Sequence, residues 1–192
     1  MTKKYGLTDK SIRDVEGPTI YRIKALRDFS NVKAGDLGGY VEFEDNLSHN
    51  GNCWVYDDAR IIGNARVYGG PQIFGSARVD GHAHVSGNAR VYENASVSGN
   101  AHVAGNAQVY GNAWIHQLAQ IYGNAQISGY SVVSGQVHIC GNAWVSADDW
   151  TNIHVKTKID RGVWTLRIHI CGGMYLLSPT LEKLFVGKLI NG

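Results

Sequence analysis

The sequence between residues 97 and 114 reads VSGNAHVAGNAQVYGNAW, in which one six-residue pattern occurs three times in a row. The period continues in both directions, because every sixth residue from Val55 to Val145 is valine or isoleucine, sixteen times without an exception. Alanine follows most of these positions by four residues. A period of six matches neither the 3.6-residue period of a helix nor the two-residue period of a long strand. It predicts a solenoid, in which each repeat buries its apolar side only against its neighbours.

Each six-residue unit predicts a short strand followed by a corner. In Ala-x-Val-x, the alternation places alanine and valine on one side of the strand and the x residues on the other. The Gly-Asn pair that follows is a turn signal, because glycine adopts positive φ at no steric cost and asparagine tolerates that region better than most residues. Many such strands, each ended by a corner, predict a coil with flat faces and a narrow core of valine, isoleucine and alanine.

This pattern resembles the hexapeptide-repeat family, whose units read aliphatic-x-x-Asn-small-x and form a left-handed parallel β-helix. The resemblance implies three hexads per coil, so residues 37–150 are expected to form an all-β solenoid of about six coils. Many members of that family carry glycine directly after the aliphatic residue, whereas here Tyr56, Tyr68 or Tyr110 occupies that position. The best-known members are trimeric acyltransferases that use a histidine base and coenzyme A. Their β-helix is commonly interrupted by an extruded loop, which the unbroken period of this chain lacks.

The flanking segments differ from the repeats in pattern and charge. Residues 1–36 predict a small N-terminal β cap with a strand over 19–26. Residues 151–192 predict a C-terminal cap with a strand over 163–171 and a short helix over 181–186. The caps carry net charges of +3 and +4, and residues 37–150 carry −5. The acidic residues of the solenoid are expected to discourage aggregation of its β surface. Alternatively, the basic caps bind phosphate-bearing partners.

Composition excludes several classes of protein and site. No apolar run is long enough to cross a membrane, and the polar start Met1-Thr2-Lys3-Lys4 predicts a cytoplasmic protein without a signal peptide. The three widely spaced cysteines form neither a disulfide framework nor a zinc pattern. There is no glycine-rich phosphate loop, no paired carboxylates and no serine with a histidine partner. We therefore expect no catalytic residues, no metal and no cofactor, and nucleic acid is not an expected partner.

Because residues eighteen apart are expected to stack, the outward residues fall on three faces, here called the first, second and third face by the positions of Arg60, Arg66 and Trp54. The third face carries a row of aromatic residues, which is too apolar to be left wet without a reason. It predicts a homo-oligomer interface, a trimer by analogy with the family. Stacking that only stabilises the coil, or a platform for a nucleobase or sugar, remains open. The expected interface residues are Trp54, Tyr56, Phe74, Tyr92 and Tyr110.

The second face is predicted to place His84 directly below His102, in a column that also holds Arg66. If a cleft lies between the second and third faces, Arg66, His84, Arg90 and His102 are expected to contact a small anionic ligand. A shared metal ion is disfavoured, because a flat face splays its side chains and no third ligand converges. An ordinary solvated polar face is the alternative.

A second resemblance covers residues 4–150. The strand Tyr-Arg-Ile-Lys-Ala-Leu (21–26), the lead-in Gly-Asp-Leu-Gly-Gly-Tyr (35–40) and the long Gly-Asn-Ala hexads are similar to uncharacterised phage and prophage proteins. This resemblance implies a non-catalytic accessory protein in the host cytoplasm that antagonises a host protein or sequesters a nucleotide-like ligand. The alternatives are a coenzyme A-dependent acyltransferase of hexapeptide type and a filament-forming structural β-helix.

Overall fold

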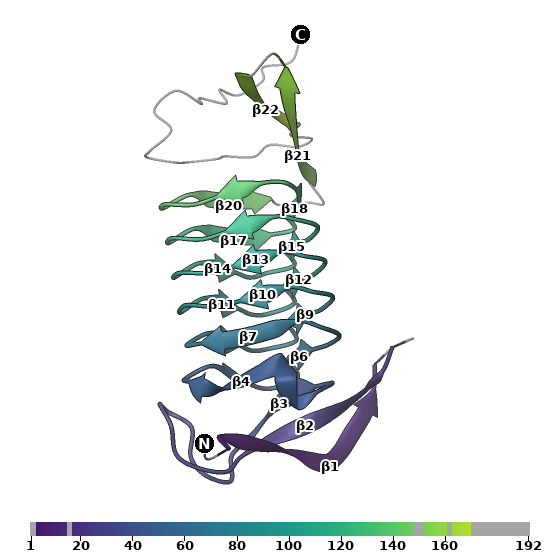
Figure 1. Ribbon diagram of the computed structural model, residues 1–192, viewed down its shortest axis with the longest axis vertical. Helices are drawn as coiled ribbons and strands as arrows, with labels where there is room; N and C mark the ends of the chain where they lie inside the picture. Colours follow the sequence, from purple (N-terminus) through teal and green to yellow (C-terminus); the bar gives the residue numbers. More distant parts are fainter. Residues whose placement is uncertain (1–2, 15–16, 148–151, 161–162, 170–192) are drawn as a thin grey trace.

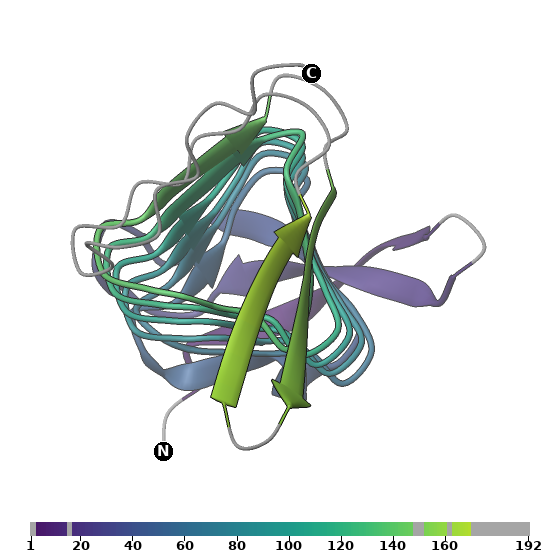
Figure 2. The same cartoon turned by 90° about the horizontal axis from the view of Figure 1, so that it is seen from above.

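The computed structural model describes residues 3–14, 17–147, 152–160 and 163–169, and it is a parallel β-helix (Figure 1). Its short strands lie in three sheets that form the three faces, and each coil contributes one strand to each sheet. Viewed along the axis, the coils superimpose as a rounded triangle (Figure 2). The second and third faces have six strands each, which confirms the expected all-β solenoid of about six coils.

The strand bounds follow the hexad. The first face holds β1 (Tyr5–Arg13), β2 (Thr19–Ala25), β3 (Leu37–Val41), β6 (Arg60–Ile61), β9 (Arg78–Val79), β12 (Ser96–Val97), β15 (Trp114–Ile115), β18 (Val132–Gly135), β21 (Asn152–Asp160) and β22 (Val163–His169). The second face holds β4 (Leu47–Gly51), β7 (Arg66–Gly69), β10 (His84–Val85), β13 (His102–Val103), β16 (Gln120–Ile121) and β19 (His138–Ile139). The third face holds β5 (Trp54–Val55), β8 (Gln72–Ile73), β11 (Arg90–Val91), β14 (Gln108–Val109), β17 (Gln126–Gly129) and β20 (Trp144–Ala147).

The register between coils is eighteen residues, because three hexads complete one turn of the solenoid. Val85 lies between Val67 and Val103 in the parallel second face. The backbone joins the coils in the same register, as where the Asn106 N–H donates to the Gly123 carbonyl at 2.7 Å. Valine, isoleucine and alanine of the hexads point inward and are almost completely buried. The core is therefore continuous along the axis, and each coil depends on the next for its hydrogen bonds.

At the corners, glycine provides the left-handed backbone conformation and asparagine provides side-chain hydrogen bonds between coils. The corner glycines, such as Gly105 at φ 69°, adopt the left-handed conformation, and Gln117 adopts it at φ 62° where its hexad lacks glycine. No asparagine within the described ranges has positive φ. Asparagines instead stack between coils, since the Asn106 side-chain amide donates to Asn124 at 3.0 Å, and Asn124 donates to Asn142 at the same distance. The tolerance of asparagine for positive φ is therefore not used at these corners, because glycine fills that position and the asparagine amide forms a ladder.

The N-terminal end is covered by an antiparallel hairpin of β1 and β2, which continues the first face next to β3. The strand expected over residues 19–26 is confirmed as β2. Asp14, at the end of β1, bonds the guanidinium groups of Arg60 and Arg78 on two successive coils. Its side chain is 1% exposed, so a buried carboxylate paired with two partly exposed arginines anchors the hairpin to the solenoid.

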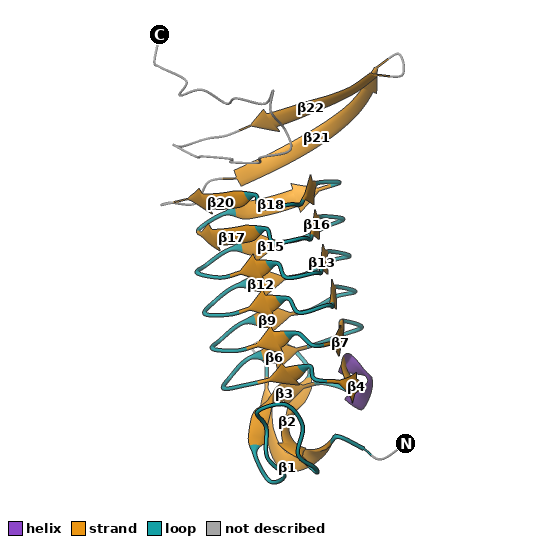
Figure 3. Cartoon of the chain, turned by 90° about the vertical axis from the view of Figure 1, so that its left-hand side faces the viewer, coloured by secondary structure: helices purple, strands orange, loops and turns teal. Residues whose placement is uncertain are grey.

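The opposite end continues the first face beyond the hexads. β21 pairs in parallel with β18 and then in antiparallel with β22, so the chain leaves the solenoid through a second hairpin (Figure 3). The strand expected over 163–171 is described as β22, up to His169. The helix expected over 181–186 lies outside the described residues. The helix seen in the described part is the 3-10 turn η1 (Glu44–Asn46), beside β4.

Candidate functional site

The third face presents a column of stacked aromatic rings. Phe74, Tyr92 and Tyr110 each follow the buried aliphatic residue of β8, β11 and β14, and the eighteen-residue register places them one above another. The ring centroids of Phe74 and Tyr92 are 4.7 Å apart with an interplanar angle of 4°. Those of Tyr92 and Tyr110 are 4.9 Å apart at 3°. We call these three residues the aromatic column.

The aromatic column is half-buried, and a polar row runs beside it. The Tyr92 hydroxyl donates to the Gln108 side-chain carbonyl at 3.4 Å, across to the next coil. Burial, followed by the neighbouring Tyr110 and Glu93, raises the pKa of Tyr92, so its hydroxyl stays a donor at neutral pH. Gln72, Arg90 and Gln108 form the parallel row in register. The face therefore places the edges of stacked aromatic rings beside a row of hydrogen-bonding side chains.

The structure corrects the lower end of this face. Trp54 is 1% exposed, and its ring packs edge-on against Phe29 at 5.3 Å and Tyr5 at 6.1 Å. Its expected outward, accessible position was wrong, because the N-terminal cap covers the first coil there. Tyr56 remains half-buried, but its hydroxyl donates to the Asn31 side chain at 3.0 Å and thus contacts the cap. Of the five expected interface residues, the three of the aromatic column lie clear of the cap, and Trp144 on β20 of the same face is 48% exposed.

The second face places His84 and His102 as expected. Their rings stack at 4.9 Å with an interplanar angle of 5°, and Arg66 is the register neighbour of His84 on the other side. Burial, the charge of His102 and then that of Arg66 lower the pKa of His84, so its imidazole is neutral at neutral pH. Equivalent nitrogens of two parallel rings at this spacing are too far apart for one zinc ion, whose Zn–N bonds are about 2.0–2.1 Å. Within the described ranges, no cluster of three or more potential metal ligands occurs.

Arg90 does not join this group. It projects from β11 on the third face, whereas Arg66, His84 and His102 project from β7, β10 and β13 on the second. His84 and Val85 form β10, and the chain turns a corner after them before it reaches Arg90, the first residue of β11. The four residues therefore belong to two different sheets, which meet at a corner of the rounded triangle (Figure 2), and their common contact with an anionic ligand stays a prediction.

The structure shows two hollows that the sequence pattern did not predict, one on each side of Arg66. The larger, about 330 Å³, is lined by Glu44, Asp45, Leu47, Ser48, His49, Arg66, Val67 and Tyr68. The smaller, about 190 Å³, is lined by Phe43, Asp45, Asn46, Gly63, Asn64, Ala65 and Arg66. Both form where η1 and β4 depart from the regular hexad. The one sequence signal was His49, which stands where the register requires an aliphatic residue.

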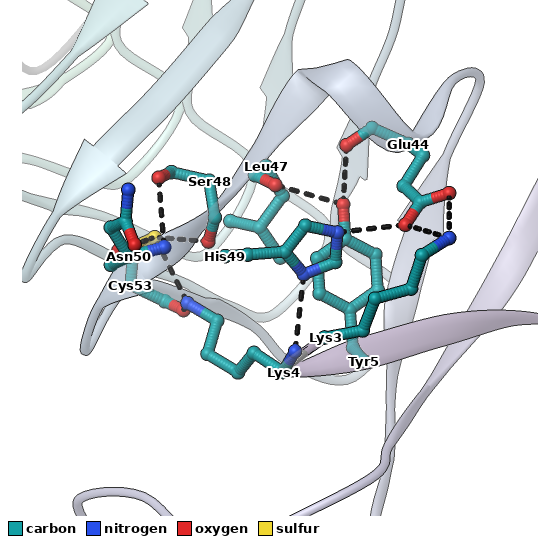
Figure 4. A network of polar contacts seen from close by, with 9 residues as sticks. All are labelled: Lys3, Lys4, Tyr5, Glu44, Leu47, Ser48, His49, Asn50 and Cys53. Atoms are coloured by element: carbon teal, nitrogen blue, oxygen red, sulfur yellow. Dashed lines mark hydrogen bonds and ion pairs between the residues drawn. The ribbon is translucent and has the colours of Figure 1, made fainter. Parts of the chain in front are cut away.

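A polar network lies behind the larger hollow (Figure 4). The His49 Nδ1 accepts the backbone N–H of Lys4 at 3.2 Å, so the ring proton is on Nε2, which donates to Glu44 at 2.7 Å. Lys3 pairs with the same carboxylate at 2.7 Å. The Tyr5 hydroxyl contacts the carbonyls of Glu44 and Leu47. Both nitrogens of His49 are thus engaged, one with the backbone just before β1 and the other with Glu44 of η1, and neither is available as a base.

Comparison with known proteins adds two findings. A family model described as the YdcK beta solenoid repeat matches residues 83–99 and 119–135, which lie in the regular coils. A stretch of 40 residues is 45% identical to a protein of Escherichia coli (strain K12) named "Uncharacterized acetyltransferase YdcK". That stretch is 21% of this chain and 12% of the E. coli protein. These similarities support a β-helix of hexapeptide type. In the described residues, no helix has the length and apolarity to span a membrane.

Proposed function

We propose that this protein is a non-catalytic binding and assembly module that associates with further copies of itself through the third face. The aromatic column carries the proposal. Aromatic residues and arginine are enriched at protein interfaces and dominate their binding energy, and here they occur together on one flat sheet. A coil that stacks its inward valines already has a complete core, so the outward rings are not needed to fill it.

The surroundings of the aromatic column favour a protein partner over a small ligand. Both hollows flank Arg66 on the second face, whereas the third face presents its rings edge by edge on a flat surface. Small molecules bind mostly in concave sites, and flat patches suit other proteins. A second copy offers the same rings and the same glutamine and arginine row. Self-association, as a trimer by analogy with the hexapeptide family, is therefore the simplest assembly.

Light scattering of the purified protein tests this proposal, together with the substitution Tyr92→Glu. We expect a discrete oligomer that the substitution converts to monomer, because it places a carboxylate beside Glu93 and between two rings. The matched control is Tyr122→Glu, a tyrosine on the second face that is 38% exposed. A wild-type monomer at all accessible concentrations would refute self-association, as would an oligomer equally sensitive to both substitutions.

A second candidate function is acetyl transfer with coenzyme A, which the name of the E. coli relative supports. If it holds, acetyl-coenzyme A binds the native state and raises the melting temperature by mass action. Changing His84 or His102 to alanine would then abolish transfer without preventing folding. No shift at millimolar acetyl-coenzyme A would argue against this candidate. The engaged nitrogens of His49 exclude it as the base in this conformation.

The finer expectation of a phage-encoded antagonist that binds a host factor or a small anionic ligand stays a prediction. Arg66 is its best-placed residue, because it is exposed, lines both hollows and makes no ion pair among the described residues. Glu44 and Asp45 share the larger hollow and oppose a highly charged anion. Inorganic phosphate should raise the melting temperature of the wild type and not of Arg66→Ala. An equal response of the two proteins would remove Arg66 from the site.

A further inference from the structure

Lys4 and Cys53 form a buried pair at the junction of the N-terminal cap and the first coil (Figure 4). Both residues are 0% exposed. The Lys4 Nζ donates to the Cys53 carbonyl at 2.8 Å and lies 3.3 Å from the Cys53 Sγ. The Phe29 ring covers the amine, with its centroid 5.0 Å from Nζ. An amine and a thiol are thus held in contact, away from water, by residues of three separate segments.

The environment favours the reactive, uncharged amine. Lysine is almost never fully buried without a counter-ion, and none of the ion pairs in the described part of the chain includes Lys4. The nearby Glu44 carboxylate is occupied by Lys3 and His49. Burial lowers the pKa of Lys4, and the Cys53 thiol only partly offsets this effect. Burial likewise raises the pKa of Cys53. Burial therefore shifts both members of the pair toward their uncharged forms.

We propose that Lys4 and Cys53 are a modification site at which a peroxide oxidant joins the two side chains covalently. Peroxide first oxidises the thiol to a sulfenic acid by two electrons and is itself reduced to water. The lone pair of the Lys4 nitrogen then attacks sulfur, the sulfur hydroxyl leaves as water with one amine proton, and a nitrogen–sulfur bond forms. The sum is one thiol, one amine and one hydrogen peroxide, giving one sulfenamide and two waters. Sulfenic acids are known to condense with nitrogen in this way.

The cross-link would fasten the cap to the solenoid. Lys4 directly precedes β1, and Cys53 directly precedes β5, so the bond closes the chain between residues 4 and 53. That segment contains the hairpin, the strand β3 and the first-coil turn η1. A covalent link across such a loop restricts the unfolded chain and raises stability. The oxidised protein should therefore melt at a higher temperature than the reduced protein, and a thiol reductant should reverse the difference.

Peptide mapping after peroxide treatment tests the site. The protein is the full chain carrying Cys140→Ser and Cys171→Ser, so that Cys53 is its single thiol. We expect a cross-linked peptide containing Lys4 and Cys53, lighter by two hydrogens than the sum of its parts and released by a reductant. A pair that retains one bridging oxygen, formed from one thiol, one amine and two peroxides with three waters released, joins the same atoms and also supports the site. Lys4→Arg should yield no cross-link and should leave Cys53 as a sulfinic or sulfenic acid.

Cys140 in the wild-type protein is the internal control, since it is partly exposed and no lysine hydrogen-bonds to it in the described part. It should be oxidised without a link to lysine. The proposal is overturned if wild-type Cys53 is recovered as a thiol or as an oxygenated acid while Cys140 has been oxidised. A link from Cys53 to another lysine would overturn it equally. Because the mapping of the wild-type protein needs no substitution, it decides the result even if Lys4→Arg fails to fold.

Discussion

The aromatic column makes a quantitative prediction about the chain itself. The Tyr92 ring lies between Phe74 at 4.7 Å and Tyr110 at 4.9 Å, nearly parallel to both. An aromatic pair contributes about 0.5–1.5 kcal/mol beyond the area it buries. Tyr92→Ala removes two such pairs, so their loss should lower the free energy of unfolding by about 1–3 kcal/mol, in addition to the cost of the apolar area that is no longer buried. A double-mutant cycle with Phe74→Ala should isolate a coupling of about 0.5–1.5 kcal/mol for one pair.

Urea unfolding followed by circular dichroism measures this coupling. The experiment is run where light scattering shows monomer, because association would add its own concentration-dependent stability. The matched control is a cycle of Tyr92 with Trp114, which is on the first face and 43% exposed. Since the two share no contact, their effects should add within about 0.3–0.5 kcal/mol.

A Phe74–Tyr92 coupling no larger than that of the control would refute the stacking energy. The rings would then be parallel only because the backbone register holds them so. A coupling of the expected size in the monomer, with no oligomer at any concentration, would instead favour the alternative in which the column only stabilises the coil.

Three further predictions concern the solenoid and its cap. Gly63→Ala and Gly87→Ala both impose φ near 65–69° on alanine, which costs about 1–2 kcal/mol. The new Cβ would lie 3.2 Å from the nearest atom of the next coil at Gly63 and 2.7 Å at Gly87. Gly87→Ala should therefore lower the free energy of unfolding by about 1–3 kcal/mol more than Gly63→Ala and should unfold at a lower urea concentration. Equal urea midpoints of the two variants would show that the closer contact at Gly87 has no energetic cost. Burial alone would raise the pKa of Asp14, but the hydrogen bonds and charges of Arg78 and Arg60 lower it overall. The ion pairs of Asp14 therefore stabilise the fold fully above the ordinary carboxylate pKa, and this stabilisation is lost as the pH falls through the lowered pKa of the folded state. Thermal melts of Asp14→Asn as a function of pH should lack this acid-dependent loss. Glu93→Ala removes the acceptor of the Gly111 N–H, a hydrogen bond of 2.8 Å at an exposed corner. Because water can replace the carboxylate, the free energy of unfolding should fall by less than about 1.5 kcal/mol. A larger decrease, measured by urea unfolding, would show that this corner contributes more to the stability of the coil.

Much of the architecture could be read from the period together with the family resemblance. With the three hexads per coil that the resemblance implies, His84 had to lie below His102, and Phe74 below Tyr92. The inward burial of valine and alanine follows from alternation within each strand. These features are local and repeated, so each unit supports the same prediction as the next. The length of the stack, about six coils, follows from counting.

The tertiary structure alone decided which outward residues remain accessible. Nothing in the hexad distinguishes Trp54 from its register neighbours, yet Phe29 and Tyr5 of the cap cover it. The contact of Lys4 with Cys53 joins segments that share no period. Such neighbours are set by how the aperiodic N-terminal cap packs on the first coil, where side-chain shape and burial outweigh any local pattern. The repeating sequence thus determined the solenoid and its three faces, and packing of the non-repeating ends determined what those faces expose.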